Sequence, residues 1–239
     1  MSIKRVVPPV ALALLLALAP RPAVALPINF ANAKIPAPGH GLFMVHPTLS
    51  ATGASQTLWG NLELGVADRL SLSLDGLALA MPQASDFGTS YLGLSYSAGR
   101  LLPWLNLRLT PLYGFKVGRF GERQAALRAY LDLYPTSRFT IYTMAAYHHR
   151  FDAAAPGAAR FDVAGEYRLM DGLNADLEVL SGTPSWDFGP NCRLAIAPGL
   201  TASIDRYTLK ASLRIPVVKA ETAQALEAPF VALGLGTRW

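Results

Sequence analysis

Hydrophobic and polar residues alternate along most of this chain, and residues 230–239 show the pattern most clearly. One parity of this segment carries Val231, Leu233, Leu235 and Trp239, and the other carries Ala232, Gly234, Gly236 and Arg238. Successive side chains of a β-strand point to opposite faces. The segment therefore predicts a strand with one apolar face and one small or charged face.

The same alternation recurs between residues 41 and 218 and predicts about twelve strands, joined alternately by short turns and longer loops. The first strand is expected at residues 41–50, with an irregular outer end at Pro47 because proline lacks an N–H. At Gly76 the apolar parity shifts from Leu74 to Leu77, which predicts a β-bulge. The expected short turns are Ala67–Arg69, Ala98–Arg100, Pro135–Ser137, Asp171–Gly172 and Asp205–Arg206.

The chain is rich in hydrophobic residues, but its body contains no long apolar run. Hydrophobic residues make up 51% of the sequence and charged residues 15%, yet beyond residue 25 there is no stretch of the ~18 apolar residues that a membrane helix needs. Only helices and closed barrels satisfy the backbone in lipid. The sequence therefore predicts an all-β fold, a single antiparallel up-and-down transmembrane β-barrel at residues 41–239 that follows a periplasmic lead-in at residues 26–40.

Soluble sandwiches and lipocalin-like barrels are the alternative, because their strands alternate too. The apolar parity here is nearly pure leucine, with aromatic residues toward the strand ends, as expected for a lipid belt with aromatic girdles. This favours the membrane barrel. The aromatic residues in question are Tyr96, Tyr113, Tyr147, Tyr207 and Trp239.

Residues 1–25 predict a cleaved secretory signal. Lys4 and Arg5 precede an apolar stretch, and residues 23–25 form a small-x-small cleavage site. Cleavage removes three basic residues and no acidic residue, so the net charge falls from +5 to +2. The positive charge that would favour binding of nucleic acid is therefore mostly lost. Cys192 is the only cysteine, which excludes a disulfide framework, and it does not lie at the cleavage site, which excludes a lipoprotein anchor.

The C-terminal ten residues also resemble the targeting signal of bacterial outer-membrane β-barrels. The resemblance lies in the alternation and in the final aromatic residue, Trp239. It implies a Gram-negative outer-membrane location, contact with outer-membrane lipid, and recognition of Trp239 by the barrel-assembly machinery. In that arrangement we expect Trp239 at the periplasmic lipid interface and Arg238 pointing into the lumen.

If the leucine parity faces lipid, the opposite parity lines a lumen, and its charged residues are the candidate pore-lining residues. Acidic residues cluster on two neighbouring strands and basic residues on others, which predicts opposed walls and a transverse field that orients small polar solutes. A lumen that is merely cross-linked by ion pairs is the equal alternative. The candidates are Glu63, Arg108, Lys116, Arg128, Asp132, Asp162, Glu166, Arg168, Asp176, Glu178, Lys210 and Arg214.

Residues 61–74, NLELGVADRLSLSL, resemble a hairpin of outer-membrane transporters of the meta-pathway phenol-degradation type. In that hairpin a strand ends in an acid-Arg turn and leads into a leucine-alternating strand. The resemblance implies uptake of small, aromatic molecules and identifies no substrate residue. The resulting hypothesis is a porin-like channel for passive uptake of small solutes, without catalytic residues, metal or cofactor.

Two other functions compete with the channel. One is a structural or adhesive barrel with a blocked lumen, whose loop at residues 186–188 contacts a partner. The other is a lipid hydrolase or acyltransferase that uses His148 or His149 as a base, oriented by Asp152, with Ser90, Ser95 or Ser97 within reach. The sequence contains no Gly-x-Ser-x-Gly motif and no metal-ligand spacing, which favours the channel.

Overall fold

The alternating segments form twelve strands that close into one barrel, as the computed structural model shows. It describes residues 33–50, 56–80, 89–116, 123–151, 157–182, 193–218 and 229–239. The strands are β1 (Gly41–Ser50), β2 (Gln56–Ala67), β3 (Leu70–Ala80), β4 (Thr89–Leu102), β5 (Leu105–Lys116), β6 (Gln124–Leu133), β7 (Phe139–Arg150), β8 (Gly157–Met170), β9 (Leu173–Gly182), β10 (Arg193–Ile204), β11 (Tyr207–Val218) and β12 (Phe230–Arg238). Among these residues no helix has the length and apolar character to cross a membrane.

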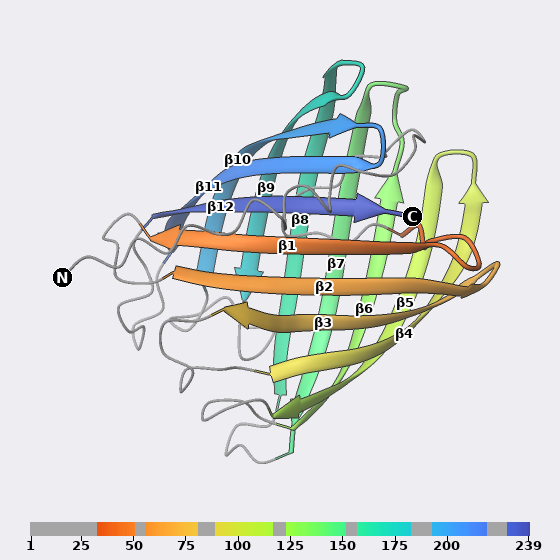
Figure 1. The fold of residues 1–239 in the computed structure, drawn as a ribbon, viewed down its shortest axis with the longest axis vertical. Coiled ribbons are helices and arrows are strands. Elements are labelled where there is room, and N and C mark those ends of the chain that lie inside the picture. Colours follow the sequence, from red (N-terminus) through yellow and green to blue (C-terminus); the bar gives the residue numbers. More distant parts are fainter. Residues whose placement is uncertain are drawn as a thin grey trace.

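Every strand pairs antiparallel with its neighbours in sequence, and β12 pairs with β1 to close the barrel. In Figure 1, β1 lies between β12 and β2, and the C-terminus lies beside the beginning of β1. The closing register places Leu42 opposite Arg238 and Thr48 opposite Ala232. The predicted all-β antiparallel barrel of about twelve strands is therefore confirmed, including the pairing of the first strand with the last.

The two ends of the barrel differ in their connections. Short turns join β2 to β3, β4 to β5, β6 to β7, β8 to β9 and β10 to β11 at one end, where β1 also begins and β12 ends. We call this the short-turn end. The connections at the opposite end, which we call the long-loop end, fall largely outside the described residues, as do residues 1–25 and the loop at residues 186–188.

Four of the five predicted short turns are confirmed, and glycine explains the one that is wrong. β4 continues through Ala98–Arg100 to Leu102, and the chain turns at residues 103–104 instead. Gly99 has a φ of +71°, and the β4–β5 register shifts by one residue beside it, so Gly99 forms a β-bulge. The predicted bulge at Gly76 is confirmed by its φ of +72° and by a register shift against β2.

The outward face of the barrel is apolar. Leucines such as Leu92, Leu127 and Leu177 are about half exposed, whereas residues of the opposite parity are mostly buried inside the barrel. Aromatic side chains extend this surface toward both ends of the strands. Those exposed near the short-turn end are Tyr96, Trp104, Tyr167 and Trp239, and those exposed near the long-loop end are Tyr113, Tyr147, Phe151 and Phe161.

Candidate pore lumen

The inward side chains of β6 to β10 form layers, because residues in register on neighbouring strands lie at the same level. The register of these strands defines two such layers. One layer contains Tyr130, Met144, Asp162, Leu180 and Ala195, and the next toward the short-turn end contains Asp132, Tyr142, Ala164, Glu178 and Ala197. All ten side chains are buried, so this part of the lumen is densely filled.

A buried ion pair links β5 to β2 across the strands between them. Nη1 of Arg108 donates to Oε2 of Glu63 at 3.2 Å, and Nη2 lies 3.0 Å from Oε1. The same guanidinium donates to the hydroxyl oxygens of Thr110 (3.1 Å) and Ser95 (2.6 Å). Ser71 on β3 donates to Glu63 Oε1 at 2.5 Å. The network therefore ties four consecutive strands together on their inward side.

The acidic cluster predicted on β8 and β9 is present, but its carboxylates are nearly inaccessible. Glu166 accepts a hydrogen bond from the Tyr142 hydroxyl at 3.1 Å, and Asp176 accepts one from Thr201 at 2.9 Å. Lys210 lies within the electrostatic influence of both of these carboxylates and of Glu178. These acids lie buried around one lysine, so a solute reaches little of their charge.

The guanidinium groups nearer the long-loop end are more accessible. Arg128 donates to Asp75 at 2.9 Å, and the side chains of this pair are 18% and 26% exposed. Arg160 donates to Asp162 at 2.5 Å, and 39% of the Arg160 side chain is exposed while none of the Asp162 side chain is. The accessible guanidinium groups therefore lie nearer the long-loop end, whereas Arg108, Lys210 and the acidic cluster are nearly inaccessible.

Residues 33–40 form a strap across the mouth at the short-turn end. Ala33 is completely buried, its N–H donates to Asp132 on β6 at 2.9 Å, and its carbonyl accepts from Ser97 on β4 at 2.9 Å. At the other end of the strap, the carbonyl of His40 accepts from Gly65 N–H at 2.9 Å. Since β6 lies about half the barrel away from β1, the strap crosses the mouth from one wall toward the other.

Tyr134, in the turn after β6, supports the wall end of the strap. Its hydroxyl donates to Asp132 Oδ2 at 3.0 Å and accepts from Asn106 at 3.1 Å, while Lys34 of the strap lies 5.2 Å from its ring centre. Burial, together with the neighbouring Asp132 carboxylate, raises the pKa of the Tyr134 phenol above its ordinary value. The phenol therefore remains a hydrogen-bond donor.

Most of the predicted pore-lining residues lie on the inward face, and the strap is the feature that the sequence did not reveal. Arg168 shares the inward parity but is exposed at the short-turn end. The side chain of Lys116 lies outside the described residues. Those placed inward are Glu63, Arg108, Arg128, Asp132, Asp162, Glu166, Asp176, Glu178, Lys210 and Arg214.

The histidines considered as catalytic bases have other contacts. His148 Nδ1 lies 3.3 Å from the Gln124 amide oxygen, and its ring packs edge-on against Tyr91 at 5.8 Å. His149 packs against Phe151 at 5.3 Å. Asp152, the expected orienting carboxylate, lies outside the described residues. The serines considered as nucleophiles also bond elsewhere: Ser90 donates to the Gly76 carbonyl, Ser95 bonds Thr110, and Ser97 donates to the Ala33 carbonyl.

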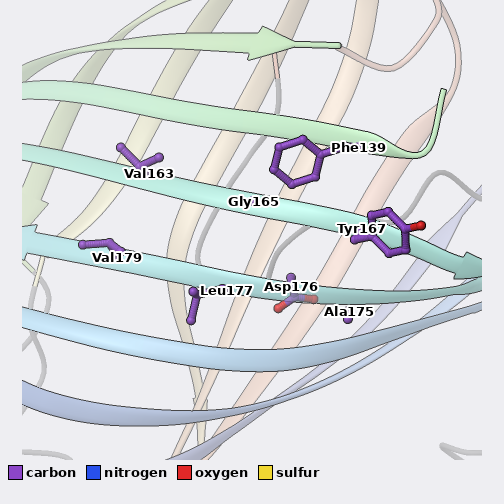
Figure 2. Close-up of a pocket in the computed structure, with 8 residues that line it drawn as sticks. All are labelled: Phe139, Val163, Gly165, Tyr167, Ala175, Asp176, Leu177 and Val179. Atoms are coloured by element: carbon purple, nitrogen blue, oxygen red, sulfur yellow. The ribbon is translucent and has the colours of Figure 1, made fainter. Parts of the chain in front are cut away.

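A groove on the barrel wall lies mainly on the outward parity and is separate from the lumen. Figure 2 shows Phe139 and Tyr167 toward one end of it, and Gly165, which has no side chain, between the flanking apolar residues. A Cβ at position 165 would lie 3.3 Å from the Phe139 ring, so the ring covers the glycine. The lining residues are Phe139, Val163, Gly165, Tyr167, Ala175, Asp176, Leu177 and Val179.

Comparisons with known proteins place this architecture among outer-membrane barrels. No protein-family model and no curated protein matches the sequence. The structure is similar to the NanC porin (TM-score 0.60, 10% identity, covering 82% of this chain and 98% of that one). It is also similar to the KdgM porin (TM-score 0.61, 6% identity, 82% and 98%) and to an outer membrane channel from Pseudomonas putida F1 (TM-score 0.61, 11% identity, 89% and 100%). The chain has the porin fold. Because the identities are so low, the similarity concerns the porin fold alone.

Proposed function

We propose that this protein is an outer-membrane channel that allows small solutes to diffuse passively, as porins do. The observation that supports this most is the division of the closed barrel into an apolar outward face and a polar, charged inward face. A soluble barrel buries its apolar face, whereas a barrel in lipid presents it to the surroundings. The similar structures are themselves called porins or an outer membrane channel, which agrees with this proposal.

The orientation in the membrane follows from the connections. Bacterial outer-membrane barrels have short periplasmic turns and longer external loops. The short-turn end and the strap at residues 33–40 would therefore face the periplasm. Trp239, which is 47% exposed, would lie at the periplasmic lipid interface, where the barrel-assembly machinery recognises the C-terminal strand.

Small aromatic molecules are a narrower proposal for the solute. It depends on the resemblance of residues 61–74 to a hairpin of phenol-degradation transporters. Tyr130 and Tyr142 of the two inward layers add no support, because both are only 3% exposed. Uptake of phenol by cells that express the parent chain, compared with uptake of a sugar of similar size, tests this narrower proposal.

Conductance of the purified protein in planar lipid bilayers tests the channel. We expect discrete current steps from protein that migrates differently on a gel before and after boiling, because such migration reports a folded barrel. Boiled protein at the same concentration is the control and should give no steps. A folded barrel that gives no steps even at high protein load contradicts the channel function.

A barrel with a blocked lumen is the second candidate, and the strap favours it. Ala33 is completely buried, and the side chains of two inward layers fill the space between the strands. A blocked barrel would give no current even after the strap is displaced by a substitution at Gly65, whose Cβ would lie 2.2 Å from the Ala37 carbonyl oxygen. A channel that the strap only narrows would conduct in the parent and conduct more in that variant.

A further inference from the structure

Two arginines flank an alanine on the inward side of β6, β7 and β8. The register pairs Arg128 with Ala146 and Ala146 with Arg160. Since neighbouring strands lie about 4.7–4.9 Å apart, the two arginine backbones are separated by about 10 Å. Ala146 contributes only a methyl group to this level, so no long side chain of β7 stands between the two arginines.

The side chains around this level add further polar and aromatic groups. His148 lies two residues beyond Ala146 on β7 and therefore on the same face. The ring of Tyr91 lies 5.3 Å from the Arg128 guanidinium and packs edge-on against His148. Arg214 lies within the electrostatic influence of Arg160 and adds a third positive charge.

Accessibility decides which sign of charge a solute meets at this level. The Arg160 side chain is 39% exposed and that of Arg128 is 18% exposed, whereas the Asp162 side chain that pairs with Arg160 is fully buried. The remaining members of the acidic cluster are at most 7% exposed. Asp75, which pairs with Arg128, is the accessible acid, at 26%. Among the described residues of this part of the lumen the accessible charge is therefore mainly positive, although the described inward residues include acids and bases in similar number.

Both guanidinium groups have the chemistry to bind a second anion. Arg128 uses Nη1 for Asp75, and Arg160 uses Nε for Asp162. A guanidinium carries five N–H donors, so donors remain on each arginine after its aspartate is bound. The planar fork of N–H groups fits a carboxylate with two parallel hydrogen bonds, which a chloride ion cannot accept in the same way.

We propose that Arg128 and Arg160 form a binding site for the carboxylate of small organic anions in the outer half of the lumen. The proposal rests on the proposed channel function and narrows it to a substrate class. Anions that enter from the long-loop end reach this site before they reach the densely filled layers nearer the strap. The site makes the channel prefer anions over cations.

Reversal potentials and benzoate block in planar bilayers test the site. Under a KCl gradient we expect the parent channel to be anion-selective, and we expect sodium benzoate to reduce its chloride current in a saturable way. Arg128→Gln and Arg160→Gln should each weaken benzoate block roughly tenfold or more, as expected for the loss of charged hydrogen bonds. The double variant Arg69→Gln/Arg138→Gln, which removes two exposed arginines at the short-turn end, is the control and should leave benzoate block unchanged.

A paired substitution tests whether anion selectivity follows the accessible charge or the net charge of the lumen. Arg160→Gln alone leaves the buried Asp162 carboxylate without its partner and can prevent folding. Arg160→Gln/Asp162→Asn removes both charges and keeps the net charge of the lumen, so anion selectivity should still fall because only Arg160 was accessible. Arg160→Lys keeps the charge and should retain selectivity while benzoate block weakens.

The outcomes distinguish this inference from the channel function on which it rests. If the folded parent gives no current, the channel function fails. If the parent conducts but prefers cations, or if Arg160→Gln/Asp162→Asn retains the parent's anion selectivity and benzoate block, the channel function survives and the carboxylate site is wrong.

Discussion

The ion pair between Arg108 and Glu63 offers a sharp test of how the barrel is held together. The Arg108 guanidinium makes four polar contacts, two with Glu63 and one each with Thr110 and Ser95. The two side chains are only 3% and 11% exposed. Replacing Arg108 with methionine removes all four contacts. The Glu63 carboxylate then keeps its hydrogen bond from the Ser71 hydroxyl.

The expected loss follows from the burial of the pair. Removing one partner of a buried ion pair leaves an uncompensated charge and costs about 3–5 kcal/mol, so Arg108→Met and Glu63→Gln should each lower the free energy of unfolding by about that amount. The double variant removes both charges of the pair and should lose less than Arg108→Met alone. The Asp75→Asn variant is the control, because its partly exposed pair with Arg128 predicts a loss of about 1 kcal/mol.

Equilibrium unfolding by urea in detergent micelles or thin bilayers measures these losses. Tryptophan fluorescence follows the transition, and migration on a gel with and without boiling confirms the folded state. The comparison requires that the slope of free energy against urea concentration stays constant among the variants. If Arg108→Met loses no more than Asp75→Asn, or if the losses of the two single variants simply add in the double variant, the reasoning about the buried network is refuted.

Two further substitutions use glycines that lie under close contacts. Gly41→Val should reduce the fraction of folded, heat-modifiable barrel, because even the Cβ would lie 2.2 Å from the Trp239 ring; an unchanged fraction would show that Trp239 adjusts freely. Gly65→Ala should raise the single-channel conductance, because its Cβ would lie 2.2 Å from the Ala37 carbonyl oxygen and displace the strap; equal conductance in the variant and the parent would mean that the strap does not restrict the passage.

The number and pairing of strands could be predicted from the sequence because apolar and polar residues must alternate in every strand, including the two that close the barrel. Each strand must place one parity toward the surroundings and one toward the interior, and the closing strands must obey the same rule. The turn predicted at Ala98–Arg100 was wrong because a glycine in a left-handed conformation is found in β-bulges as well as in turns. At Gly99, φ is +71° within a strand that continues to Leu102.

Alternation predicts the face on which a charge lies but not its accessibility. Arg160 and Asp162 lie two residues apart on the same face of β8, yet 39% of one side chain and none of the other is exposed. Accessibility depends on which side chains of neighbouring strands and of the strap occupy the same level, and register and packing determine this. The opposed acidic and basic walls expected from parity therefore stay a prediction, because parity does not say how much of each charge a solute can reach.

The strap could not be predicted from local patterns because its contacts are distant in sequence. Ala33 and Asp132 are 99 residues apart, and Ala33 and Ser97 are 64 residues apart. Residues 33–40 contain no hydrophobic period, and in the sequence they resemble a linker. Only the closed barrel brings the partners of Ala33 to the mouth through which the strap passes.

Trp239 takes part both in closing the barrel and in holding one end of the strap. The carbonyl of Trp239 accepts hydrogen bonds from Gly41 N–H at 3.2 Å and from His40 Nδ1 at 2.8 Å. Gly41 begins the first strand and His40 ends the strap, so the last residue of the chain holds both. The far end of the strap is fixed on the opposite wall by Asp132 and Ser97. When β12 pairs with β1, residues 33–40 are therefore held at both ends, and the position of the strap becomes a consequence of closing the barrel.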